Sequence, residues 1–246
     1  MFSGFIGVLD SGIGGLSVLK KLVKNLPNEK FIYLGDNLNA PYGNKSKREL
    51  LSLTINNINI LCSHPLKAIV LACNTLSTNL LHEIRECVCV PIFPIFPPIE
   101  ICEIKMKKTL LLATCATAKN YKRTEWCDVV GLEGLAGEIE EKIFNLNSID
   151  LALNMREKSY GDFIDEKGWY DTVILGCTHY EFIKNKILDH FCPQKVTCGA
   201  DFLLKNLKHH FIASKSLVKH SQNQVMFIGD SAGLNKELFE SYILIN

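Results

Sequence analysis

Short segments rich in Val, Ile, Leu and Phe alternate along the chain with longer segments in which apolar residues recur at helical spacing. The first pattern is typical of buried strands and the second of amphipathic helices. Strands are predicted at residues 5–9, 31–34, 68–71, 90–95, 109–113, 172–175 and 225–228, and helices at 16–23, 46–61, 77–86, 139–144, 181–190 and 202–210. This alternation predicts an α/β fold with mainly parallel sheets and helices on both faces.

One strand-to-helix unit occurs twice. The segments AIVLACNTLST (68–78) and TVILGCTHYEF (172–182) share an apolar strand, a small residue, a cysteine, two polar residues and then a helix. Their cysteines, Cys73 and Cys177, are 177 − 73 = 104 residues apart, about the length of one small domain. A duplicated half would place the two thiols on matching strand ends, across a cleft. We therefore expect two similar lobes, one of residues 1–98 and 212–246 and one of residues 99–211.

The composition is that of an ordinary soluble globular protein. Of the 246 residues, 47% are hydrophobic and 22% are charged. The chain has 27 Lys and Arg against 26 Asp and Glu. It therefore lacks the surplus of basic residues that would indicate binding to nucleic acid or to an anionic membrane. Uncharged stretches are too short or too proline-rich for a membrane helix, and Asp10 interrupts the only segment that resembles a secretory signal. Ten cysteines without such a signal indicate free thiols and a cytoplasmic location.

Two motifs could indicate a metal or a cofactor. Cys87-Val88-Cys89 has the residues of a zinc site, but no second pair follows at ligand spacing. The glycine-rich turn at 12–15 follows a strand, as in dinucleotide sites, and Asp36 could bind a ribose. However, Ser17 stands where the third glycine of that motif belongs, and Asp10 would repel a pyrophosphate. The turn is better suited to a small anion such as a carboxylate, so we expect no metal and no cofactor.

Three predicted strands of the first half end in polar or reactive residues, Asp10, Asp36 and Cys73, and in a parallel sheet such ends line one crevice. The stretches around them are distinctive: IGVLDSGIGGLSVLKKL, YLGDNLNAPYG, ACNT and GCTHYEF, with weaker support from LLLATCATAKNY and GEIEEKI. By these stretches, which span most of the chain, it resembles the glutamate racemases of the cofactor-independent aspartate/glutamate racemase family.

The resemblance implies two α/β lobes with glutamate in the cleft between them, and a role in supplying D-glutamate for peptidoglycan. Cys73 and Cys177 match the two catalytic thiols, with Asp10 and His179 beside them to mediate proton transfer. Positions that match ligand-contacting residues are Asp10, Ser11, Tyr42, Gly43, Asn74, Thr75, Thr114, Thr117, Thr178 and His179.

A carboxylate of the second lobe is also implied beside the far cysteine. Glu140 is the expected residue, with Glu138 and Glu141 as alternatives. The family further implies a homodimer. A departure from the family pattern is Asn37, where relatives often carry Thr; others occur at 39–40, 96–98, 137 and 197–201.

Two thiols suit this reaction, because racemisation removes a proton from one face of Cα and delivers another to the opposite face. Without pyridoxal phosphate to delocalise the carbanion, the site must hold a base and an acid on opposite faces at once. Two alternatives remain open. One is a racemase or isomerase of the same family that acts on aspartate or another small acid. The other is a non-catalytic protein that binds an acidic metabolite or a protein partner.

Overall fold

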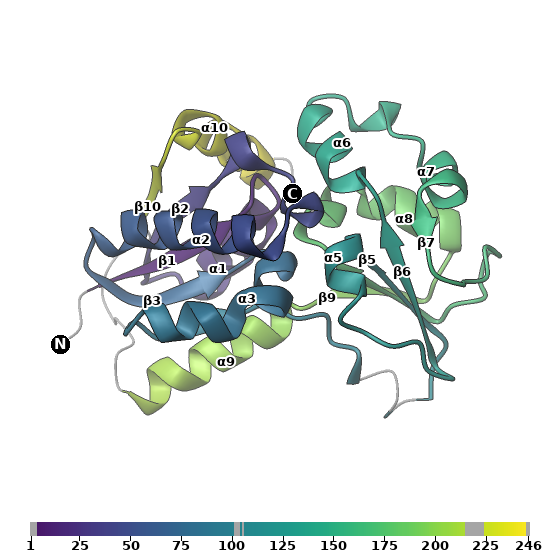
Figure 1. The fold of residues 1–246 in the computed structure, drawn as a ribbon, viewed down its shortest axis with the longest axis horizontal. Helices are drawn as coiled ribbons and strands as arrows, with labels where there is room; N and C mark the ends of the chain where they lie inside the picture. The colour runs from purple at the N-terminus through teal and green to yellow at the C-terminus, as the bar shows by residue number, and fades with distance from the viewer. Residues whose placement is uncertain (1–3, 101–103, 105, 215–223, 245–246) are drawn as a thin grey trace.

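The computed structural model describes residues 4–100, 104, 106–214 and 224–244. Two five-stranded sheets, each covered by helices, lie side by side along the longest axis of the molecule (Figure 1). No helix in the described ranges is both long and apolar enough to cross a membrane.

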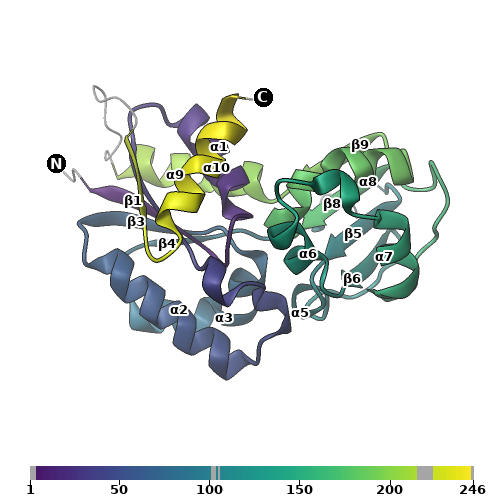
Figure 2. The same ribbon diagram turned by 90° about the horizontal axis from the view of Figure 1, so that it is seen from above.

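The first sheet has the strand order β10-β2-β1-β3-β4, and all its pairings are parallel. Its strands are β1 (Phe5–Asp10), β2 (Lys30–Gly35), β3 (Leu66–Leu71), β4 (Ile92–Pro94) and β10 (Gln224–Ile228). One face is covered by α1 (Gly15–Asn25), α9 (Ala200–Ala213) and α10 (Ala232–Leu244), and the other by α2 (Lys47–Cys62) and α3 (Asn74–Cys87), as Figure 2 shows.

The second sheet has the order β7-β6-β5-β8-β9, in which β7 alone is antiparallel to its neighbour. Its strands are β5 (Thr109–Ala113), β6 (Cys127–Leu132), β7 (Ser159–Tyr160), β8 (Thr172–Gly176) and β9 (Lys195–Cys198). Its helices are α5 (Cys115–Ala118), α6 (Leu135–Glu141), α7 (Leu151–Glu157) and α8 (Lys184–Phe191), joined by short 3-10 turns that include η3 (Leu146–Ser148) and η4 (Thr178–Ile183). The two sheets therefore share one plan, and β3 and β8 hold the same position in each.

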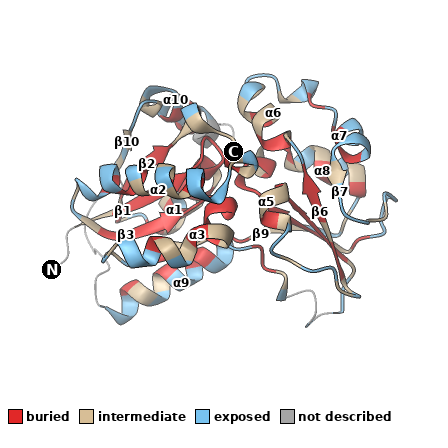
Figure 3. Ribbon diagram, viewed as in Figure 1, coloured by how far each residue is buried: buried red, intermediate tan, exposed pale blue. Residues whose placement is uncertain are grey.

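The central strands β1, β3 and β5 are apolar along nearly their whole length because helices cover both faces of each sheet. Figure 3 shows this as red strands under helices whose outer faces are pale blue. The predicted strands are all present, and β10 returns to the first sheet as expected, where it pairs in parallel with β2. The helix expected at 139–144 instead spans Leu135–Glu141. The first part of the helix expected at 181–190 is the 3-10 turn η4.

The chain returns to the first sheet earlier than the sequence-based boundary at residue 212. Helix α9 packs its apolar side chains, including Leu203, Leu207 and Phe211, into the core beside α1. In Figure 1 this light-green helix lies under the first sheet, away from the other green elements. The predicted range 99–211 placed α9 in the second lobe, whereas its apolar side chains belong to the core of the first.

The two segments that connect the sheets pass very close to each other. A Cβ atom on Gly199, at the start of α9, would lie 2.1 Å from the carbonyl oxygen of Phe96, which follows β4. Only glycine fits this position. This contact gives a physical reason for the glycine of the TCGAD stretch.

Candidate active site

Cys73 and Cys177 occupy equivalent places, directly beyond β3 and β8. Cys73 is the residue before α3, and Cys177 is the residue before η4. Both side chains are almost fully buried, at 5% and 6% exposure. They line one cavity, where the carboxyl ends of the two sheets meet.

The cavity lies between the lobes and is small. Its lining comes from both lobes: Ser11, Pro41, Tyr42, Gly43, Cys73, Asn74, Thr75, Thr114, Ala136, Cys177, Thr178 and His179. The free space is about 10 Å³, which is room for about one water molecule. With the lobes in this arrangement, the cavity has no room for a molecule as large as an amino acid.

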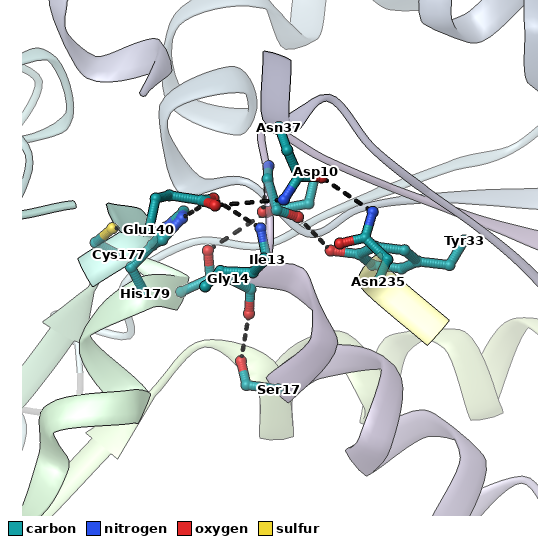
Figure 4. A network of polar contacts seen from close by, with 12 residues as sticks. Asp10, Ile13, Gly14, Ser17, Tyr33, Asn37, Glu140, Cys177, His179 and Asn235 are labelled. Carbon is teal, nitrogen blue, oxygen red and sulfur yellow. Dashed lines mark hydrogen bonds and ion pairs between the residues drawn. The ribbon is translucent and has the colours of Figure 1, made fainter. Parts of the chain in front are cut away.

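On the second-lobe side, Cys177 belongs to a chain of polar contacts. Its Sγ lies 3.7 Å from Nδ1 of His179, and Nε2 of His179 lies 2.7 Å from Oε1 of Glu140 (Figure 4). Burial by itself would lower the pKa of His179, but its hydrogen bonds to Cys177 and Glu140 and their charges hold that pKa well above its ordinary value. His179 is thereby suited to take the thiol proton and to carry a positive charge beside the sulfur.

The glycine-rich turn after β1 binds a carboxylate, and that carboxylate is the protein's own. The backbone amide of Ile13 donates to Oε1 of Glu140 at 2.7 Å, across the boundary between the lobes. A Cβ atom on Gly12 would lie 1.7 Å from that oxygen, and one on Gly14 would lie 2.4 Å from Oγ1 of Thr178. The glycines are therefore required by the close approach of the second lobe. The sequence predicted that this turn directs amides at a small anion; in this structure the anion bound by the Ile13 amide is the side chain of Glu140.

On the first-lobe side, Cys73 lies in different surroundings. Burial and the nearby charge of Asp10 raise the pKa of the Cys73 thiol to about 12, partly offset by hydrogen bonds with the Leu76 amide and Ser11. Asp10 is itself fully buried and accepts from the amide of Gly12 at 3.1 Å. Burial raises the pKa of Asp10, although the charge of His179 acts in the opposite direction. Cys73 is thus suited to hold a proton.

Threonine hydroxyls close the cavity from both lobes. Oγ1 of Thr75 lies 3.1 Å from Oγ1 of Thr114 and 3.4 Å from that of Thr117. Oγ1 of Thr178 donates to Asp10 at 3.3 Å. Nδ2 of Asn74, at the cavity wall, is buried without a hydrogen-bond partner among the described residues. Because an unpaired buried donor is costly, this amide is positioned for an acceptor that a ligand would supply.

Tyr42 lines the cavity, and its hydroxyl bonds to two residues that do not. It donates to Oδ2 of Asp36 at 2.5 Å and accepts from Nδ2 of Asn57 at 3.1 Å. Burial raises the pKa of Tyr42, so the hydroxyl stays protonated. Asp36 therefore fixes the Pro41-Tyr42-Gly43 loop and does not lie at the cavity wall.

The structure brings together the residues expected from the sequence. Most of them line the cavity, while Asp10, Glu140 and Thr117 stand directly behind it and bond to lining residues. Of the alternatives to Glu140, Glu138 bonds to Lys142 and Asn154, away from the cavity, and Glu141 is exposed.

Sequence reasoning missed several residues of this site. Pro41 and Ala136 line the cavity, and the hydroxyl of Tyr33 supports the glycine turn by donating to the carbonyl of Gly12 at 2.6 Å. Asn37 and Asn235 extend the contacts of Glu140. Asn37 lies in the stretch YLGDNLNAPYG, where it stands out only as a departure from the family pattern, and Asn235 lies in no motif. No group of three or more His, Cys, Asp or Glu side chains in the described ranges is arranged to hold a metal ion.

Comparison with known proteins extends the resemblance. The glutamate racemase of Clostridium botulinum is 37% identical over 193 residues, 74% of this chain and 73% of that one. The glutamate racemase of Clostridium novyi is 34% identical and aligns over 96% of this chain and 94% of its own. No model in a collection of protein families matches the chain.

A solved structure agrees with these relatives. The crystal structure of the Thermus thermophilus glutamate racemase, in complex with β-chloro-D-alanine, superimposes with a TM-score of 0.77 at 28% identity. The match covers 98% of this chain and 93% of the other. With relatives similar over nearly its whole length and the same fold, the chain belongs to the glutamate racemase family.

Proposed function

We propose that this chain interconverts L- and D-glutamate without a cofactor, with Cys73 and Cys177 on opposite faces of the substrate Cα. The observation that carries the proposal is the pair of buried thiols from matching strand ends on one cavity. In the L-to-D direction, the Cys177 thiolate removes the Cα proton and the Cys73 thiol delivers its own proton to the opposite face. The reverse reaction starts from the exchanged protonation state.

The surroundings of the two thiols support this division of roles. His179 can accept the proton of Cys177, and Glu140 stabilises the resulting imidazolium across a 2.7 Å contact. On the other side, the raised pKa of Cys73 keeps the thiol protonated and ready to donate. Asp10, beside both Cys73 and Thr178, is proposed to mediate proton transfer on the Cys73 face.

Hydroxyl and amide groups of the cavity wall are proposed to bind the substrate carboxylates. The free Nδ2 of Asn74 and the hydroxyls of Ser11, Thr75 and Thr178 are neutral donors, which can hold an anion without neutralising a nearby thiolate. Thr114, Thr117, Tyr42 and Gly43 complete the proposed wall. Binding requires the hydroxyl contacts between Thr75 and the second lobe to be exchanged for contacts with the ligand.

Turnover by the purified protein tests the proposal. L-Glutamate and L-aspartate are incubated separately, and the D-enantiomer is measured by chiral chromatography. We expect D-glutamate to accumulate to a racemic mixture and aspartate to react far more slowly. Preferential turnover of aspartate would favour the alternative small-acid racemase. Binding of glutamate without turnover would favour the non-catalytic alternative.

We further propose that the D-glutamate supplies peptidoglycan synthesis in the cytoplasm, and that the protein is a homodimer. Every cysteine in the described ranges is a free thiol, which fits a reducing compartment. Large apolar side chains such as Leu38 and Phe144 are exposed, at 72% and 75%, and could be covered by a second copy. Light scattering after size-exclusion chromatography measures the assembly, and D-glutamate dependence of a deletion strain measures the cellular role.

A further inference from the structure

Glu140, the carboxylate beside His179, is held by both of its oxygens, and two of its partners come from the other lobe. Oε1 lies 2.7 Å from Nε2 of His179 and 2.7 Å from the amide of Ile13. Oε2 accepts a hydrogen bond of 3.3 Å from Nδ2 of Asn37. Asn37 begins the 3-10 turn η1 (Asn37–Asn39) just after β2, so this contact joins the first lobe to the second (Figure 4).

The orientation of Asn37 follows from its two partners. A carboxylate only accepts hydrogen bonds, so the NH₂ group of Asn37 faces Glu140 and its Oδ1 faces away. Oδ1 accepts from Nδ2 of Asn235 at 2.9 Å. Asn235 lies on α10 with 0% exposure. The side chains thus form a one-directional series of hydrogen bonds from α10 through Asn37 to Glu140.

We propose that Asn37 is a positioning residue for proton transfer at Cys177, and that Asn235 sets its orientation. Asn37 fixes Oε2 of Glu140, which keeps Oε1 aligned with His179. Because Asn37 and Ile13 lie on the first lobe and Glu140 on the second, the carboxylate is held in this way only when the lobes are together. The inference rests on the proposed function, since it assigns a role within the same proton transfer.

Loss of activity alone would not show which thiol is affected. Two enantiomers have equal free energies, so kcat/KM must fall by the same factor in both directions. Isotope effects separate the two steps. Suppose that proton transfer at Cys177 becomes slower. Removal of deuterium from L-[2-²H]glutamate, which occurs at Cys177, then becomes more rate-limiting. Removal of deuterium from D-[2-²H]glutamate, which occurs at Cys73, becomes less rate-limiting. A change that merely loosens the lobes slows both steps and does not produce this opposition.

The test compares Asn37→Ala with Asn79→Ala. Asn79, on α3, is a matched control because it also donates across the lobe boundary, to the carbonyl of Ala116 at 3.3 Å, and none of its hydrogen bonds is to Glu140 or His179. For Asn37→Ala we expect kcat/KM to fall roughly fivefold, since the lost bond is long. The deuterium isotope effect on kcat/KM should rise for L-glutamate and fall for D-glutamate. Asn79→Ala should leave both isotope effects as in the wild type.

Asn235→Ser provides a second variant away from the cavity, and thermal unfolding is measured for all three. The Asn235→Ser substitution removes the group that donates to Asn37 and adds no charge. It should shift the isotope effects in the same directions as Asn37→Ala, by a smaller amount. Isotope effects that stay unchanged, or that change equally for both enantiomers, in folded Asn37→Ala and Asn235→Ser proteins would overturn the inference. Absence of racemisation by the wild type would instead overturn the proposed function.

Discussion

The two sides of the cleft are built on the same plan but provide different chemistry. Cys73 and Cys177 follow equivalent strands, yet Cys177 contacts a histidine whose charge Glu140 balances, while Cys73 lies beside the carboxylate of Asp10. A negative neighbour and burial favour a protonated Cys73, whereas the sulfur of Cys177 lies beside a histidine ring nitrogen. The shared fold therefore places the two sulfurs, and the residues beside each sulfur differ between the lobes.

The largest effect is expected from removing either sulfur. Cys73→Ala and Cys177→Ala should each lower kcat by at least about 10³-fold, because each thiol serves one face of Cα and the other cannot replace it. The thermal midpoint should change by only a few degrees, since each change deletes one atom. Turnover by chiral chromatography and unfolding by circular dichroism check this. Near-normal turnover by either variant would refute the paired-thiol account.

Gly12→Ala should have the next largest effect, because it disturbs the contact between the two sides. The new Cβ atom would lie 1.7 Å from Oε1 of Glu140, so the Glu140 carboxylate would have to leave its contacts with the Ile13 amide and His179. We expect kcat/KM to fall about 100-fold with both lobes folded. Gly233→Ala is the matched control, because a Cβ atom there meets nothing within 4 Å, and it should retain full activity. Equal activities of the two variants would contradict the role given to lobe contact.

Glu140→Gln should affect the Cys177 side alone and more moderately. It keeps the shape of the side chain but removes the charge that stabilises the His179 imidazolium, so kcat/KM should fall about 30-fold. Glu138→Gln is the control, because that carboxylate contacts Lys142 and Asn154 instead. If Glu138→Gln lowered kcat/KM more than Glu140→Gln, then Glu140 would be the wrong residue for the second-lobe carboxylate.

The smallest effect is a pH dependence of stability. The pKa of His179 is higher in the folded protein than its ordinary value near 6.5, so the folded state binds more protons above that pH. The stabilisation is fully present below about pH 6.5 and is lost as pH rises toward the folded pKa. Between about pH 6.5 and 8, the free energy of unfolding of the wild type should fall by about 1–2 kcal/mol more than that of His179→Gln.

Urea unfolding at several pH values measures this difference. The window ends at about pH 8 because the raised pKa of Cys73 adds a similar decline at higher pH. Parallel pH profiles for the two proteins would mean that His179 is not stabilised in its charged form.

The positions of the thiols could be predicted from the sequence because the strand–Cys–helix unit is local and repeated. Val70 and Leu71 precede Cys73 much as Ile174 and Leu175 precede Cys177, and each apolar run ends at a parallel strand end. The polar turn residues beside them follow from the same rule, since the ends of neighbouring parallel strands meet at one edge.

Contacts that depend on how the lobes meet could not be predicted in this way. Nothing local in SAGLNK indicates that Asn235 is buried against Asn37, because 198 residues separate them and α10 is amphipathic only weakly. The packing of α9 against the first sheet likewise depends on the path of the chain at Gly199. Glu140, and not Glu138 or Glu141, contacts the glycine turn because of the way α6 lies against it, and no local pattern in the sequence shows that orientation.

The most direct test of the two-thiol account is racemisation in D₂O at low conversion. L-Glutamate is reacted briefly, the enantiomers are separated, and deuterium at Cα is measured by mass spectrometry. The account predicts that D-glutamate carries deuterium from Cys73, while the remaining L-glutamate stays protiated because the closed cavity keeps Cys177 from exchanging with solvent. D-Glutamate that keeps the original proton in substantial amount would indicate a single base and would contradict the account.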